Sequence, residues 1–119
     1  FMVSVNDDDV VTREADRVDI QMKRWEARIQ SLVKNVTNKK MQPFFTVIQP
    51  GGGSHGMYCH EGEEFGFVLK GELELVLNDK VHTVRENESF YFSSQIPHNW
   101  ENTGKEDVLI IWVITPPTF

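Results

Sequence analysis

The chain has 119 residues, of which 39% are hydrophobic and 25% charged, and its formal net charge is −6 at pH 7. This length and composition predict one globular domain with its own core, and they exclude a disordered chain. The negative charge argues against direct binding to a nucleic-acid backbone, and no apolar run is long enough to span a bilayer. The single Cys59 excludes an internal disulfide, which predicts a cytoplasmic protein.

Residues 1–40 are polar and charged, with apolar residues spaced between them. Trp25, Ala27 and Ile29 alternate with period two, which favours a strand, although residues 22–33 also fit a short helix. We therefore predict that residues 1–40 form a polar N-terminal segment that adds strands to a barrel built from residues 41–119.

Beyond Pro43 the chain consists of short apolar runs separated by turn residues. Tight turns are expected at residues 70–71 and 78–80. The predicted strands are residues 44–49, 64–69, 72–77, 81–85, 89–93, 97–101 and 107–115. Many short strands with almost no helix predict an all-β sandwich or barrel.

One predicted strand carries a carboxylate that can point into the core. Glu64, Gly66 and Val68 share one face, and Phe65, Phe67 and Leu69 share the other. If Glu64 faces inward, its charge needs a partner, because an unpaired buried charge is costly. A metal ion or a cationic ligand would supply that partner.

Two histidines occur at positions that can complete such a site. Residues 60–71 have the spacing His-x3-Glu-x6-Gly, and residues 97–102 read Pro-His-x3-Asn. His60, Glu64 and His98 would form a set of two imidazoles and one carboxylate, which suits iron(II), manganese, zinc or nickel. The same three side chains could also hydrogen-bond to one another without a metal.

These spacings resemble the two signature motifs of the cupin superfamily over roughly residues 41–115. The residues that match are His60, Glu64, Gly71, His98 and Asn102. Those that depart are Tyr58, which stands where a first histidine is expected, and Asn87, Ser93 and Gln95. The resemblance implies a double-stranded β-helix, or jelly-roll barrel, with a metal site reduced to three ligands.

We expect a ligand pocket beside this site. Tyr58 precedes His60 by two residues, and Trp100 shares the face of His98, so both are expected to line the pocket. Tyr91 is a further candidate, since a buried hydroxyl needs a partner. Gln95 completes the expected pocket residues.

Residues 59–75 and 112–119 look like the C-terminal cupin of bacterial transcriptional regulators that carry an Xre-type helix-turn-helix domain. This resemblance implies a sensor domain that binds a small-molecule effector, with DNA contacted only through an N-terminal domain absent from this chain. An amino acid, a polyamine or a sugar acid would all fit. We also expect a homodimer, in which Trp25 and Ile29 cover a sheet edge of the partner.

Two other classes fit the same residues. Iron(II)-dependent oxygenases and epoxidases with a cupin domain use two histidines and a glutamate, so His60, Glu64 and His98 could hold iron in an enzyme. A storage or scaffold cupin without a ligand is the third class. The motifs assign no catalytic residue, and these three are candidate metal ligands.

Overall fold

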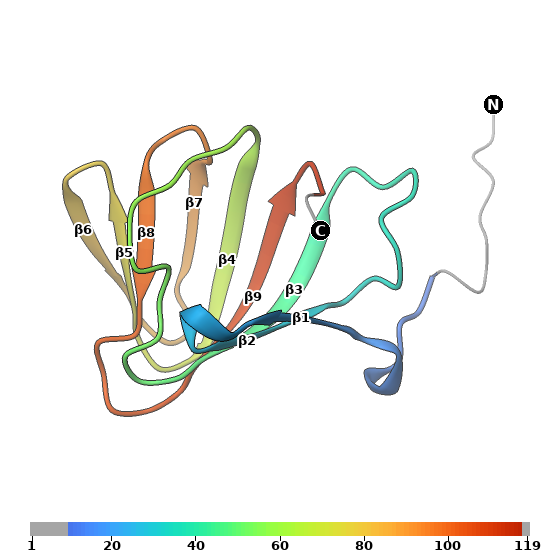
Figure 1. Cartoon of the computed structure of the whole chain (residues 1–119), viewed down its shortest axis with the longest axis horizontal. Coiled ribbons are helices and arrows are strands. Elements are labelled where there is room, and N and C mark those ends of the chain that lie inside the picture. The colour runs from blue at the N-terminus through green and yellow to red at the C-terminus, as the bar shows by residue number, and fades with distance from the viewer. Residues whose placement is uncertain (1–9, 118–119) are drawn as a thin grey trace.

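Two antiparallel sheets form the framework of the computed structural model, which describes residues 10–117 (Figure 1). One sheet has the strand order β1-β2-β3-β9-β4-β7, and the other has the order β6-β5-β8. The strands are β1 (Val18–Met22), β2 (Ala27–Ser31), β3 (Gln42–Ile48), β4 (Glu63–Lys70), β5 (Leu73–Leu77), β6 (Lys80–Val84), β7 (Ser89–Ser93), β8 (His98–Glu101) and β9 (Val108–Thr115).

The predicted jelly-roll fold is confirmed. Seven strands were expected after residue 43, and β3 to β9 occupy those positions with ends that differ by at most two residues. The helical content of residues 10–117 is limited to two 3₁₀ turns, η2 (Glu14–Asp16) and η3 (Lys23–Trp25). Neither is long enough to cross a membrane, and residues 10–117 contain no other helix.

The N-terminal segment forms a hairpin rather than a helix. β1 pairs with β2, β2 pairs with β3, and the hairpin therefore extends the six-stranded sheet. Trp25 lies in the turn η3 between the two strands, not within a strand as its spacing suggested. Residues 1–9 and 118–119 lie outside the described residues.

Alternating side chains fill the space between the sheets. In β3 and β9 the residue exposure alternates strictly between buried and half-buried, as expected for strands with one face on the core. The hydrophobic core consists of Ile29, Phe44, Ile48, Val68, Leu73, Leu75, Val84, Phe90, Phe92, Trp100, Val108, Ile110, Trp112 and Ile114.

A glycine loop holds the hairpin turn against β8. The backbone N–H of Gly53 donates to the carbonyl of Trp25 at 2.9 Å, and Gly53 also forms a bridge with Glu101. A Cβ atom at Gly53 would lie 2.5 Å from the carbonyl oxygen of Trp100, so only glycine allows this approach. The loop thus fixes Trp25 beside Trp100.

Candidate metal and ligand site

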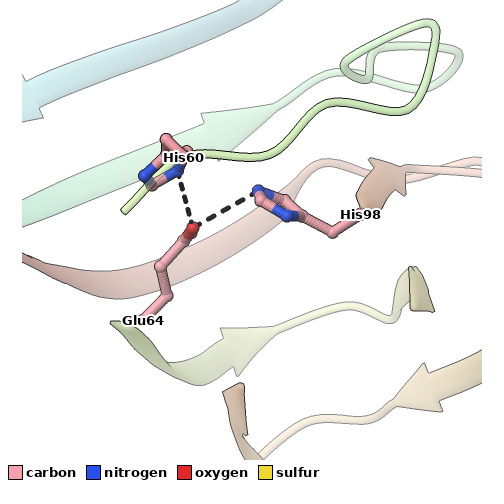
Figure 2. Close-up of side chains that lie close together, drawn as sticks. All are labelled: His60, Glu64 and His98. Atoms are coloured by element: carbon pink, nitrogen blue, oxygen red, sulfur yellow. Dashed lines mark ion pairs between the residues drawn. The ribbon is translucent and has the colours of Figure 1, made fainter. Parts of the chain in front are cut away.

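The three candidate ligands come from separate parts of the chain and point toward one another (Figure 2). His60 lies in the loop before β4, Glu64 is the second residue of β4, and His98 is the first residue of β8. Tyr58 and His98 exchange two backbone hydrogen bonds of 3.0 and 2.9 Å, which fixes the loop before β4 against β8. The backbone therefore positions all three side chains.

Their polar atoms lie close enough to bind one ion. The Nε2 atom of His60 is 3.0 Å from Oε2 of Glu64, and Nε2 of His98 is 3.3 Å from the same oxygen. One potential ligand atom from each residue lies within 4.8 Å of the others. Glu64 and His98 are buried, whereas His60 keeps about a third of its side chain accessible.

A hydrogen bond at Nδ1 fixes the tautomer of each histidine. Nδ1 of His60 is 3.0 Å from the carbonyl of Glu61, and Nδ1 of His98 is 2.7 Å from the carbonyl of Ile96. A carbonyl only accepts, so each Nδ1 carries a proton. In its neutral form each imidazole then directs the Nε2 lone pair at the carboxylate, an arrangement that is favourable only with a cation between them or with a protonated imidazole.

The buried polar atoms fit a metal ion. Nε2 of His98 is the one buried side-chain nitrogen or oxygen in the described part of the chain that has no hydrogen-bond partner. Glu64 is held by the side chains of Ser94 and Trp112, which donate to its two oxygens at 2.8 Å each. Two imidazole nitrogens and one oriented carboxylate form the donor set that suits first-row divalent metals.

The electrostatics of the site favour ionised Glu64 and protonated His98 when no metal is present. Burial alone would raise the pKa of Glu64, but His98, Ser94 and Trp112 stabilise the carboxylate and lower its pKa. Burial alone would lower the pKa of His98, but the Glu64 carboxylate and the Ile96 carbonyl raise it.

A cavity of about 300 Å³ opens beside the three residues. This volume is at the lower end of the range for small-molecule sites. All three tryptophans of the chain take part in its wall. The lining residues are Trp25, Ile29, Phe44, Thr46, Tyr58, His60, Glu64, Trp100, Trp112 and Ile114.

Tyr58 occupies the position of the missing first histidine and is a neutral hydroxyl. Burial raises the pKa of Tyr58 to about 12, so a phenolate is disfavoured as a metal ligand near neutral pH. Its oxygen accepts a hydrogen bond of 2.9 Å from Nε1 of Trp100. Its own proton has no acceptor among the described side chains and is available to a molecule in the cavity.

Two of the four expected pocket residues lie elsewhere. Tyr58 and Trp100 line the cavity, but Tyr91 is 63% exposed and donates a hydrogen bond to Glu63 on the outer surface. Tyr91 faces outward because its neighbours Phe90 and Phe92 face the core, and side chains alternate along a strand. Gln95 is exposed in the turn that follows β7, outside the cavity wall.

Several cavity residues were not foreseen from the sequence. Trp25 and Ile29 were expected at a dimer contact, but they face the chain's own cavity. The sequence assigned Trp112 no role in the site, yet it both lines the cavity and donates to Glu64. Ser94 had no expected role; its position two residues after the inward Phe92 was the available signal.

The family model described as Cupin domain matches residues 44–114. The HTH-type transcriptional regulator PuuR of Escherichia coli is 32% identical over 118 residues, which cover 98% of this chain and 58% of the regulator. The oxalate-binding protein of Thermotoga maritima is 32% identical over 84 residues, 70% of this chain and 69% of that protein. This chain therefore spans less than two thirds of the regulator's length.

Among solved structures, the fold matches the Cupin_2 domain of an XRE family transcriptional regulator from Enterobacter cloacae. The TM-score is 0.69 at 23% sequence identity, and the match covers 78% of this chain and 99% of that domain. At this identity the match establishes a shared fold.

Proposed function

Because the chain belongs to the cupin family, we propose that it is the effector-binding domain of a bacterial transcriptional regulator. A small molecule would enter the aromatic cavity beside His60, Glu64 and His98, and a separate helix-turn-helix domain would contact DNA. The similarity to PuuR over 98% of this chain supports the regulator class, and the net charge of −6 supports a DNA-binding surface elsewhere.

The observation that carries the proposal is the position of the buried carboxylate at the wall of an aromatic cavity. Glu64 is 3% exposed and fixed by four neighbouring polar groups, yet it still borders a space large enough for a small molecule. A polar cluster that served stability alone would be closed by packing, since core space is normally filled. Convergent polar groups in an apolar pocket are typical of a ligand site.

We propose that His60, Glu64 and His98 hold an iron, manganese, zinc or nickel ion as part of this site. When bound, the ion would act as a Lewis acid with open positions for an oxygen or nitrogen donor. Tyr58 would donate its hydroxyl proton to the ligand, and the tryptophans would exclude water from it.

The N-terminal hairpin gives a route by which a ligand could affect the rest of a regulator. Trp25 stacks on Tyr58 with ring centroids 6.1 Å apart and meets Trp100 edge-on at 5.1 Å. A ligand that contacts Trp25 would favour one position of the hairpin β1–β2. Such a difference in affinity between two arrangements is the physical requirement for regulation.

We also propose that the domain acts as a cytoplasmic homodimer. Regulators with a helix-turn-helix commonly bind two-fold symmetric sites as dimers. The exposed, unpaired Cys59 is compatible with a reducing compartment.

The oxygenase alternative uses the same three ligands but receives less support from the cavity. Among the described residues, no lysine or arginine lines it, so an anionic substrate such as a phosphonate would find no cationic side chain. An enzyme of this kind would consume oxygen when loaded with iron(II), which an oxygen electrode measures directly.

The decisive experiment is a titration of the metal-free protein with Mn²⁺, Zn²⁺, Ni²⁺ and anaerobic Fe²⁺. Tryptophan fluorescence is the readout, because every tryptophan lines the cavity, and elemental analysis gives the stoichiometry. We expect one ion per chain and a fluorescence change on binding. The same signal then serves to screen amino acids, amines and carboxylic acids as effectors.

Variants show whether metal binding takes place at the three candidate ligands. His98→Ala should weaken metal binding by more than the 10- to 100-fold that loss of an outer hydrogen-bond partner costs, and circular dichroism checks that the variant is folded. His82→Ala is the matched control, since His82 is exposed on β6. Equal metal binding in both variants, or no response of the wild type to any metal or compound, would refute the proposed site.

A further inference from the structure

One threonine interrupts the apolar part of the cavity wall, away from the three candidate ligands. Thr46 is 3% exposed, faces inward from β3 and lines the cavity. Its neighbours in the same row of the sheet are Ile29 on β2 and Ile110 on β9. A valine has nearly the same shape as a threonine, so packing among these aliphatic side chains does not explain why a hydroxyl is present here.

The hydroxyl of Thr46 faces open space inside the domain. Among the described residues, its side chain forms no hydrogen bond. Nε2 of His98 is the one polar side-chain atom of residues 10–117 that is both fully enclosed and unpaired. The unpaired hydroxyl of Thr46 must therefore keep open space beside it, and the cavity is the space that this residue borders. A polar group without a partner in an apolar wall costs stability, and a bound molecule would supply the partner.

Thr46 lies far from the candidate ligands along the cavity. The row of Thr46 crosses β9 at Ile110, whereas the row of Glu64 crosses it at Ile114, four residues further on. Because β9 also separates the two strands, strand geometry of about 3.3 Å per residue and about 4.8 Å between strands puts the two positions roughly 16 Å apart. Phe44 lies in the row between them and lines the cavity as well. The cavity wall is thus apolar in the middle and polar at both ends.

The end of the cavity at Thr46 carries no charge. Among the described residues that line the cavity, the ionisable side chains are Tyr58, His60 and Glu64, which lie at the other end. A threonine hydroxyl can donate or accept a hydrogen bond and therefore pairs with an uncharged polar group. An ion beside Thr46 would lose its water without gaining an opposite charge, which is costly.

We infer that the cavity takes an elongated molecule with an apolar middle and a different polar group at each end. One end carries an oxygen or nitrogen donor that reaches the site of His60, Glu64 and His98. The other end carries an uncharged group, such as a hydroxyl or an amide, that hydrogen-bonds to Thr46. Thr46 then determines specificity, because molecules that lack the second group leave its hydroxyl unpaired. This inference rests on the proposed effector-binding function and narrows the class of effector.

Pairs of carboxylic acids that differ only by a hydroxyl on the last carbon test the inference. Acids of about six to ten carbons, with and without this hydroxyl, are titrated into the zinc-loaded and the metal-free chain, with tryptophan fluorescence as the readout. At the chain length that spans the cavity, we expect the hydroxy acid to bind about three- to tenfold more tightly than the plain acid, as is usual for one hydrogen bond. Thr46→Val should reverse this preference, since the hydroxyl of the acid then meets an apolar wall.

Two further variants and a stability measurement separate recognition from packing. Thr46→Ser keeps the hydroxyl and should keep the preference. Thr83→Val is the matched control, because Thr83 is exposed on β6 of the other sheet, and it should also keep the preference. Without any acid, Thr46→Val should unfold at the same urea concentration as the wild type or at a higher one, since no partner inside the protein is lost.

A preference for the hydroxy acid that Thr46→Val retains overturns the inference. Equal binding of both acids to the wild type at every chain length does so too, as does a chain that binds zinc but none of the acids. A clear fall in the urea midpoint of Thr46→Val would assign the hydroxyl to the fold instead of to a ligand. These outcomes leave the proposed function standing, whereas its own failure is recognised by a wild type whose fluorescence responds to no metal and no compound.

Discussion

The two faces of the six-stranded sheet each carry side chains that stability of the fold alone does not explain. Along β4, the inward positions include Glu64 and Gly66, while the outward positions carry Phe65 and Phe67. A buried carboxylate therefore lies one residue from an exposed aromatic ring. The usual arrangement for stability is the reverse, with charge outside and apolar surface inside.

This inversion is informative because each face departs from the stable pattern in its own way. The inner face accepts the cost of burying Glu64 and leaves a space beside it. The outer face accepts the exposure of apolar side chains such as Phe65 and Tyr91. Proteins tend to break local rules where function requires it, so we place the proposed ligand site on the inner face.

The largest effect is expected at Gly66 on the inner face. A Cβ atom there would lie 2.1 Å from Cζ of Phe90, a ring that is 8% exposed and packs edge-on against Trp112 at 5.0 Å. Gly66→Val should therefore lower the free energy of unfolding by about 3 kcal/mol, the upper range for overpacked cores, as measured by urea denaturation.

The neighbouring outward residue supplies the comparison. Phe65→Thr should cost less, about 1–2 kcal/mol, since Phe65 already keeps 43% of its surface exposed within one chain. Equal losses for Gly66→Val and Phe65→Thr would mean that the outer face supports the fold as much as the inner face does.

The two tyrosines of the chain give a second, smaller contrast. Tyr58→Phe removes the acceptor of the Trp100 indole N–H inside the domain and should cost about 1–2 kcal/mol. Tyr91→Phe removes a hydroxyl that bonds Glu63 at the surface and should change stability by less than about 0.5 kcal/mol. A larger loss at Tyr91 than at Tyr58, both measured by urea denaturation, would contradict the assignment of the two faces.

Strand positions and the convergence of the three candidate ligands could be predicted because both depend on local spacing. Period-two alternation and turn residues located β3 to β9, and two short motifs located His60, Glu64 and His98. The cavity wall could not be predicted in the same way. Alternation says that Phe44 faces inward, but whether it packs tightly or borders a space depends on the distance between sheets, which the sequence pattern does not encode.

The errors have specific physical causes. Tyr91 was assigned to the pocket from its chemistry, although its position between two inward phenylalanines required the outer face. Trp25 was assigned to a strand from its spacing; the turn η3 and the glycine loop instead bring it over the cavity. Such long-range placement follows from backbone contacts between residues 25 and 53, which have no local signature.

The smallest expected effect is the pH dependence of the metal-free protein, and its sign distinguishes the inner site from surface charges. The pKa of His98 is raised above its ordinary value of 6.5, so the stability it contributes is complete below pH 6.5 and is lost as the pH rises through the pKa of the folded state. The pKa of Glu64 is lowered from 4.5, so its contribution is complete above pH 4.5 and is lost on acidification below that value.

Together the two residues predict a stability maximum between pH 4.5 and 6.5, with a decline toward higher pH in the presence of a chelator. His98→Gln should abolish the decline on the alkaline side, whereas His82→Gln at the surface should preserve it. Metal affinity should change in the opposite direction and rise with pH, because the ion competes with the proton for Nε2 of His98. If the metal-free wild type instead gained stability from pH 6.5 to 8.5 in urea denaturation, protonated His98 could not be the partner of Glu64.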